Sequence, residues 1–461
     1  MNIRVHMVLG LTCILAGCLF VSCAPSPIIE SIPTDTPDEM DVNLRQLLAE
    51  ADVEPLAELP APDENMYALG QALFFDKELS GNRDISCATC HHPTLATADA
   101  LSLSIGVGGV GLGTERVIDP TREFVPRNAP DIFNRGDPGW LTMFWDSRVS
   151  GTLETRFNTP AGVRLPAEID SLLAAQAMFP VTSPDEMRGE RGDVDVFGEH
   201  NELAPILNHE FEAIWDALMQ RLLAIPEYQE LFAAAYPDVP EDELNFAHAA
   251  NAIAVFEATS WHFTDSPWDR YLLGDDSALT LEAKRGAILF YGEAGCGECH
   301  SGPLLTDQQH YNMAVPQIGP GKGLGAPLDL GRAEESDMDE DRFAFRTPPL
   351  RNVVLTGPWM HNGTYTTLEA AVLHQLDPLK DMYAYDPTVL DPLVDIEYIT
   401  HDYVVSTMLE TIDPVARETI ELSQAEIGDL LAFLEALTSP SALDMSDDIP
   451  ESVPSGLPVN D

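Results

Sequence analysis

The sequence is poor in positive charge. Among its 461 residues there are 24 Lys and Arg against 76 Asp and Glu, which gives a formal net charge of −52. Nucleic-acid binding needs a basic surface, and anionic membranes attract basic segments, so the composition argues against both as main partners. With 45% hydrophobic residues the chain can still fold, and its length suits about two or three domains.

The sequence also lacks a hydrophobic run long enough to span a bilayer. The apolar run Val8–Ala16 follows Arg4 and is typical of a secretory signal, and it ends in a Leu-Ala-Gly-Cys box of the bacterial lipoprotein type. We therefore expect residues 1–17 to be a signal peptide and Cys18 to carry a lipid anchor. Cys23 is a second candidate, and ordinary secretion without a lipid is the alternative. The protein would then be exported, to the periplasm or the outer cell surface.

Strand signals are sparse, whereas a weak repeat of helical character occurs twice. Gly70–Phe75 and Gly286–Tyr291 are similar, and each precedes a pair of cysteines. Helices are also predicted at Leu244–Thr259 and at Ser423–Leu437, where Ser423 and Glu426 have the spacing of a capping box. Two acidic, Pro-rich segments flank this part: we expect residues 18–45 to be a linker and 441–461 a disordered tail.

Cysteine is scarce, and outside the leader region only two short motifs contain it. They are Cys87-Ala88-Thr89-Cys90-His91 and Cys296-Gly297-Glu298-Cys299-His300. Cys-x-x-Cys-His is the attachment motif of c-type haem, because cysteines one helical turn apart both reach the macrocycle edge and the adjacent histidine ligates the iron. A single copy could be a zinc half-site or a redox dithiol, but zinc needs further ligands and no other cysteines remain.

These motifs predict two covalently bound haem c groups in a mostly α-helical protein. The expected architecture is two cytochrome c-like domains with one haem each, at residues 46–264 and 265–440. The iron of the first haem would be ligated by His91 and that of the second by His300.

With these motifs the chain resembles the bacterial di-haem cytochrome c peroxidases and their MauG-like relatives, over roughly residues 65–440. Further local matches are Arg127–Pro130, Phe144–Arg148, Phe179–Met187 and Phe345–Gly363. The resemblance implies that hydrogen peroxide is reduced at the N-terminal haem. Electrons would arrive through the C-terminal haem from a small redox protein, a cytochrome c or a cupredoxin.

The resemblance also implies roles for side chains of the peroxide pocket. Glu186 matches the glutamate that moves protons during O–O cleavage, and Gln176 matches the glutamine of the same pocket. A carboxylate suits this task because it can take a proton from one peroxide oxygen and return it to the other.

Two features are implied between the haems. Trp145 matches a tryptophan that serves as a stepping stone for electrons. Asn128, together with the backbone carbonyls of Thr356 and Pro358, matches a calcium site, and such hard oxygen ligands are those that Ca²⁺ prefers.

In two places the sequence departs from the family. No histidine lies between His92 and His200, so the histidine that caps the first iron in many peroxide-reducing members has no counterpart, as in MauG-like members. The family's distal Met or Tyr on the second haem is replaced by Gln375, a poor iron ligand. We expect the neighbouring His374 to ligate this iron, with Met360 and Gln375 as alternatives.

Three functions are compatible with the sequence. The first is a peroxidase, and the second is a MauG-like enzyme that uses peroxide to oxidise Trp or Tyr side chains of a partner protein. The missing capping histidine and the absent Met favour the second. The third is a passive electron carrier, which would gain nothing from an open iron beside Glu186.

Overall fold

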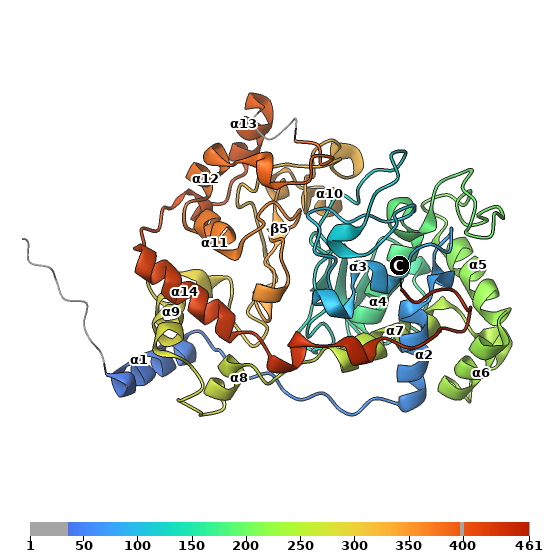
Figure 1. Ribbon diagram of the computed structural model, residues 1–461, viewed down its shortest axis with the longest axis horizontal. Helices are drawn as coiled ribbons and strands as arrows, with labels where there is room; N and C mark the ends of the chain where they lie inside the picture. Colours follow the sequence, from blue (N-terminus) through green and yellow to red (C-terminus); the bar gives the residue numbers. More distant parts are fainter. Residues whose placement is uncertain (1–35, 397–400, 461) are drawn as a thin grey trace, which may run out of the picture.

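The structure, a computed structural model, describes residues 36–396 and 401–460. The predicted signal segment and Cys18 lie outside the described residues. Within those two ranges, no helix is long and apolar enough to cross a membrane. The molecule is mostly helical, as predicted, and two halves lie side by side along its longest axis (Figure 1).

The N-terminal half is built around two crossing helices, α2 and α7. Its helices are α2 (Glu64–Phe75), α3 (Cys87–Cys90), α4 (Leu172–Ala177), α5 (Phe211–Leu223), α6 (Pro226–Ala235) and α7 (Phe246–Ser260). An antiparallel sheet in the order β1-β2-β3 is formed by β1 (Thr142–Met143), β2 (Val149–Thr152) and β3 (Arg156–Asn158). Phe74, Phe256 and Trp261 form the centre of the core, with ring centroids 5.1 to 5.4 Å apart.

The C-terminal half repeats this design with α9 and α14. Its elements are α8 (Pro267–Leu272), α9 (Leu281–Tyr291), α10 (Ala333–Ser336), α11 (Leu368–Leu376), α12 (Pro378–Ala384), α13 (Asp402–Glu410), α14 (Gln424–Ala436), and the paired strands β4 (His310–Tyr311) and β5 (Phe345–Arg346). Phe433 of α14 packs edge-on against Trp268 and Phe290 at 5.0 and 5.1 Å. The predicted domain boundary at residues 264 and 265 falls between α7 and α8.

The repeated glycine of the sequence explains why both helix pairs cross so closely. A Cβ atom on Gly70 of α2 would lie 1.9 Å from the carbonyl oxygen of Ala252 on α7. A Cβ atom on Gly286 of α9 would lie 1.9 Å from the carbonyl oxygen of Asp429 on α14. Only glycine permits this close approach of the two backbones. The same helix packing is therefore found in both halves.

The predicted helices agree with the structure to within two residues at their ends. The helix expected at Leu244–Thr259 is α7, which begins at Phe246 after the cap Asn245. Ser423 caps α14, and the capping box with Glu426 is formed as predicted. His374 and Gln375, the two neighbours weighed as iron ligands, both lie on α11.

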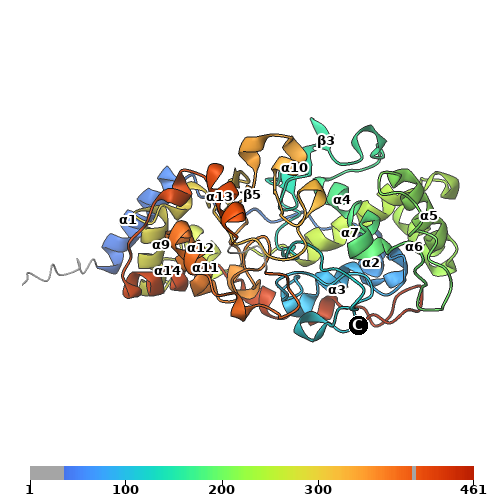
Figure 2. The ribbon, with the colours of Figure 1, turned by 90° about the horizontal axis from the view of Figure 1, so that it is seen from above.

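The segment expected to be a linker contains a helix that docks on the opposite half. Helix α1 (Pro37–Glu50) packs against α9, with Leu44 fully buried (Figure 2). Lys284 Nζ of α9 lies 2.7 Å from the Asp41 carboxylate, and both side chains are largely buried. The linker prediction is therefore wrong for residues 37–45, because apolar side chains interspersed among the acids give this segment a face that can be buried.

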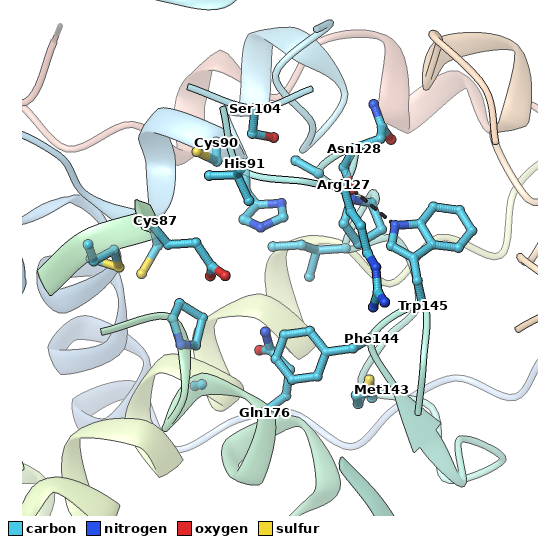
Figure 3. Close-up of a pocket in the computed structure, with 18 of the residues that line it drawn as sticks. Cys87, Cys90, His91, Ser104, Arg127, Asn128, Met143, Phe144, Trp145 and Gln176 are labelled. Carbon is cyan, nitrogen blue, oxygen red and sulfur yellow. Dashed lines mark hydrogen bonds between the residues drawn. The ribbon is translucent and has the colours of Figure 1, made fainter. Parts of the chain in front are cut away.

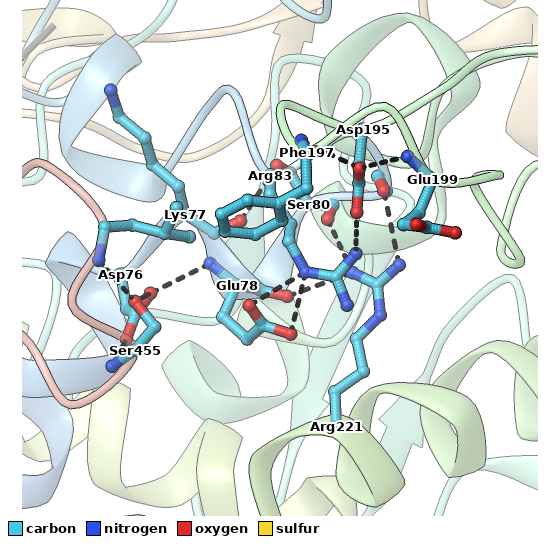
Figure 4. A network of polar contacts seen from close by, with 12 residues as sticks. Asp76, Lys77, Glu78, Ser80, Arg83, Asp195, Phe197, Glu199, Arg221 and Ser455 are labelled. Carbon is cyan, nitrogen blue, oxygen red and sulfur yellow. Dashed lines mark hydrogen bonds and ion pairs between the residues drawn. The ribbon is translucent and has the colours of Figure 1, made fainter. Parts of the chain in front are cut away.

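The segment expected to be a disordered tail packs along the N-terminal half instead. Ala442, Met445 and Val453 belong to the core of that half. Ser455 Oγ donates a hydrogen bond of 2.6 Å to the buried carboxylate of Asp76, next to the polar network shown in Figure 4. The disorder prediction failed because it rested on average composition, whereas three well-spaced apolar side chains are enough to anchor the segment.

Candidate haem cavities

The first Cys-x-x-Cys-His motif opens on a cavity of the N-terminal half. Cys87, Cys90 and His91 line it, and both thiols are free of disulfide bonds (Figure 3). His91 Nδ1 lies 3.0 Å from the carbonyl oxygen of Thr97, which fixes the ring and leaves Nε2 available as a ligand atom. Burial lowers the pKa of His91 to about 4, so the imidazole is in the neutral form that binds iron.

The second motif forms an equivalent arrangement in the C-terminal half. Cys296, Cys299 and His300 line a second cavity, and these thiols are also free. His300 Nδ1 lies 3.1 Å from the carbonyl oxygen of Leu305, and burial lowers the pKa of this imidazole too. Both cavities thus present two thiols and one oriented neutral imidazole, the donor set of haem c.

Buried arginines between the cavities supply a second test of whether the two cavities fit haem c. Arg135 and Arg346 line both cavities and are almost fully buried. Arg135 forms an ion pair with Asp131 at a distance of 3.5 Å. The Nη1 atom of Arg135 has no hydrogen-bond partner among the described residues. Burial and the charge of Arg135 lower the pKa of Arg346 to about 9. Such cations need anionic partners, and the carboxylates of haem would provide them.

The two side chains implied in peroxide chemistry lie together in the first cavity. Gln176 of α4 faces it from the side opposite the His91 imidazole (Figure 3). Glu186 lies in the short turn Pro184–Arg188, whose N-terminus is capped by Ser183. Desolvation raises the pKa of Glu186, while the positive charges of Arg148 and Lys322 oppose this shift. The carboxyl group can therefore exchange protons with a ligand in the cavity.

Two further charged residues of this cavity were not found from the sequence. Glu257 of α7 has an oxygen without a hydrogen-bond partner, and burial raises its pKa to about 8. Glu257 lies four residues after Ile253 and so on the same face of the helix, and Ile253 also lines the cavity. A charged residue on this otherwise apolar face was a sequence signal for a cavity residue. Lys322 reaches the cavity from the C-terminal half, and no sequence signal indicates that placement.

Lys322 takes part in a cluster of buried charges around Asp146, the residue that follows Trp145 in its loop. The carboxylate of Asp146 pairs with Lys322, with Arg127 at 2.5 Å and with Arg148 at 3.1 Å. These cations hold the pKa of Asp146 well below its usual value despite its complete burial. Residues from both halves therefore fix the conformation of this loop.

Trp145 and Asn128 lie in the wall shared by the two cavities. Trp145 Nε1 donates a hydrogen bond of 3.0 Å to the carbonyl oxygen of Asn128 (Figure 3). Thr356 and Pro358 line the second cavity together with Asn128, so the residues of the predicted calcium site lie around one space. No cluster of three or more His, Cys, Asp or Glu side chains suited to a metal occurs in the described ranges, and this set contains none of them.

The prediction that His374 ligates the second iron is wrong in this structure. His374 is fully buried outside the cavity, with Nε2 2.9 Å from the carbonyl oxygen of Met313 and Nδ1 2.7 Å from the Tyr365 hydroxyl. The residues of α11 that line the cavity are Leu368, Ala371, Val372, Gln375 and Leu376. Helical periodicity turns Gln375 inward and its neighbour away.

The two alternatives for this ligand are both present at the cavity. Met360 and Gln375 line it, and Gln375 Nε2 lies 3.7 Å from Met360 Sδ. The two side chains are therefore neighbours at the cavity, and either could ligate the iron of the second haem.

Comparisons with known proteins agree with this geometry. The sequence profile of the family described as di-haem cytochrome c peroxidase matches residues 64–277. MauG of Methylorubrum extorquens is 31% identical over 378 residues, which cover 81% of this chain and 78% of MauG. The cytochrome c551 peroxidase of Pseudomonas aeruginosa is 30% identical over 309 residues, 67% of this chain and 71% of that protein.

A solved structure is similar over most of its length. A MauG-like protein associated with microbial copper homeostasis has a TM-score of 0.57 and 26% identity, covering 85% of this chain and 94% of that one. Since relatives at this level of identity include both MauG and cytochrome c peroxidases, the specific role is not decided by similarity alone. The chain belongs to the di-haem cytochrome c peroxidase and MauG family, whose haem c groups are covalently bound.

Proposed function

We propose that the protein is a peroxidase that reduces hydrogen peroxide at the first cavity, with electrons delivered through the second. The observation that carries the proposal is that Glu186 and Gln176 line the same cavity as Cys87, Cys90 and His91 of the first motif. When bound, haem supplies the iron that takes peroxide and the route by which electrons arrive. Reduction of one peroxide to two waters consumes two electrons and two protons.

Glu186 is the proton carrier in this proposal. Its carboxyl group is partly desolvated and opens on the cavity, and Arg148 and Lys322 keep its pKa from rising further. A group balanced in this way can accept a proton from the proximal peroxide oxygen and return it to the departing one. Gln176 would orient the peroxide by hydrogen bonding from the same side.

Trp145 is the electron stepping stone between the cavities. It lines both of them, and its indole N–H is held by the carbonyl oxygen of Asn128. A calcium ion held by Asn128 and the carbonyls of Thr356 and Pro358 would stabilise this wall.

A second candidate function is the oxidation of Trp or Tyr side chains on a partner protein, as a MauG-like enzyme. Among the described residues that line the first cavity, His91 is the sole histidine. No second imidazole is therefore at hand to cap the iron, which favours reaction with peroxide in the fully oxidised state. The similarity to MauG supports the same reading.

We further propose that the protein acts after export, with Cys18 as its lipid anchor. Its net charge of −52 would attract a basic electron donor by long-range steering. Turnover with a basic cytochrome should then fall as ionic strength rises, and a salt-independent rate would contradict steering.

The deciding experiment is a visible and near-infrared spectrum of the fully ferric protein, before and after one equivalent of hydrogen peroxide. The peroxidase and the MauG-like function both predict one high-spin haem that reacts at once. Turnover with a reduced donor then supports the first function, and oxidation of a specific protein partner supports the second. Two low-spin haems that stay inert even after partial reduction would show a passive carrier and overturn the proposal.

A further inference from the structure

A column of three aromatic rings leads from the second haem motif to helix α1. Tyr291, at the end of α9, lies against the motif so closely that a Cβ atom on Gly297 would come 2.4 Å from its Cδ1. Trp268 of α8 stacks on Tyr291, with ring centroids 6.1 Å apart and planes 11° apart. Trp268 also stacks on Tyr271, with ring centroids 6.0 Å apart and planes 15° apart. The three side chains are among the most easily oxidised in proteins, and their spacing permits electron transfer.

The column ends at Tyr271, which contacts Asp41 and Arg45 of α1, and α1 lies at one end of the molecule (Figure 2). The Tyr271 hydroxyl donates a hydrogen bond of 3.1 Å to Asp41, which also pairs with Lys284. The guanidinium group of Arg45 lies 4.5 Å above the Tyr271 ring and is 39% exposed. Tyr271 is therefore fully buried, and the partly exposed side chain of Arg45 covers its ring.

The three rings differ in whether they can release a proton. The indole N–H of Trp268 and the hydroxyl of Tyr291 are buried without a hydrogen-bond partner among the described residues. Tyr271 alone in the column has a carboxylate as its partner. Burial and the negative charge of Asp41 raise the pKa of Tyr271, so this phenol is protonated at neutral pH. A tyrosine that loses an electron must also lose its proton, and only Tyr271 can do so locally.

We propose that Tyr271 is a redox-active tyrosine that supplies an electron to the second haem site through Trp268 and Tyr291. The electron leaves the phenol ring, the O–H bond breaks, and the proton moves to the Asp41 carboxylate, which leaves a neutral tyrosyl radical. Hydrogen peroxide is the oxidant: its reduction to two waters takes two protons from solvent and two electrons, one from Tyr271 and the other from the external donor or, where no donor is present, from the haem groups. This inference rests on the proposed function, because peroxide is its source of oxidising power.

The test is freeze-quench electron paramagnetic resonance of the di-haem holoprotein after one equivalent of peroxide, without an external donor. We expect an organic radical signal that narrows when ring-deuterated tyrosine is incorporated. The signal should be lost in Tyr271→Phe and strongly reduced in Trp268→Phe, which keeps an aromatic ring in the core. Asp41→Asn, which removes the proton acceptor, should also reduce it.

Tyr228→Phe is the matched control. Tyr228 is fully buried and donates a hydrogen bond of 2.8 Å to Asp76, but the aromatic ring that packs on it is that of Phe232 and not a tryptophan. This variant should keep the full signal. Tyr311, which lines the second cavity and donates to Asp307 at 2.8 Å, is the competing site. A signal that survives in Tyr271→Phe, or disappears in Tyr311→Phe instead, would overturn the inference.

The optical change of the haems on adding peroxide separates this inference from the proposed function. If the wild type shows no such change, the proposed function fails and no radical is expected. If the change occurs in every variant but the radical does not depend on Tyr271, the column is core packing and the inference alone fails.

Discussion

The two cavities share an attachment motif and differ in what surrounds it. Apart from Asp131 in the shared wall, the first is lined by the acids Glu186 and Glu257, while the second has no carboxylate of its own among the described lining residues. The second is instead lined by aliphatic and aromatic side chains with Met360 and Gln375. The repeated scaffold therefore carries buried carboxyl groups of its own in one cavity only, which is the difference that the proposed division between a site of chemistry and a site of electron transfer requires.

The largest effect should come from removing the proton carrier of the first cavity. Glu186→Gln should slow the reaction of the ferric protein with peroxide by roughly 10²–10⁴-fold, because general acid–base catalysis contributes about that much. Stopped-flow absorbance measures the rate. Asp185→Asn, at the exposed neighbouring acid, should have little effect.

A double variant tests whether the difference between the cavities matters. Glu186→Gln combined with Gln375→Glu transfers the carboxyl group to the second cavity. The rate should stay low, because the second site faces an apolar lining. Recovery of the peroxide reaction would contradict the proposed difference between the cavities and show that they are interchangeable.

Each terminal segment should stabilise the half that is more distant from it in the sequence. Truncation after Ser439 removes Ala442, Met445 and Val453 from the N-terminal core and should cost roughly 3–6 kcal/mol of unfolding free energy. Leu44→Ala in α1 should cost about 2–5 kcal/mol, but in the C-terminal half. Denaturant unfolding followed through the absorbance of each haem checks this. Equal loss in both halves would contradict a local role for either segment.

The two haem motifs should tolerate substitution differently at their second position. Gly297→Ala places a Cβ atom against the Tyr291 ring and should destabilise the C-terminal half by about 1–3 kcal/mol. Ala88→Gly in the first motif should cost only about 0.5–1 kcal/mol. Thermal unfolding of both variants gives the difference, and a neutral Gly297→Ala would show that Tyr291 can move aside.

The smallest expected effect is on pH dependence. The charge of Lys322 lowers the pKa of Glu186, so Lys322→Met should raise that pKa. Where the reaction needs the carboxylate, the acid limb of the rate profile should then move to higher pH, by about one unit or less. Lys380→Met, at an exposed lysine of α12, should leave the profile unchanged.

Local patterns were enough to predict the haem motifs and the helices, whereas Glu186 and Gln176 were indicated by the resemblance to the family alone. The glycine repeat and the capping box of Ser423 act over a few residues, so the sequence shows them directly. The choice of His374 over Gln375 as iron ligand failed although helical periodicity, a local pattern, indicates which of the two faces the cavity. Histidine was preferred because it is the better iron ligand, and the position on the helix was given less weight.

The missed features depend on contacts between distant segments. Lys322 meets Asp146 across 176 residues, and Ser455 meets Asp76 across 379. No periodicity or motif carries such a pairing, since it depends on how the two halves are placed. The acidic, Pro-rich composition of both terminal segments also hid the few apolar side chains that anchor them.

The exchange of terminal segments between the halves has a consequence for the order of folding. During synthesis the N-terminal half emerges first, yet Met445 and Val453 of its core follow the whole C-terminal half in the sequence. Helix α1, made early, has no surface to dock on until α9 exists. The N-terminal half therefore cannot reach its final packing until residues 442–453 have been made, whereas the core of the C-terminal half contains no described residue beyond Leu437.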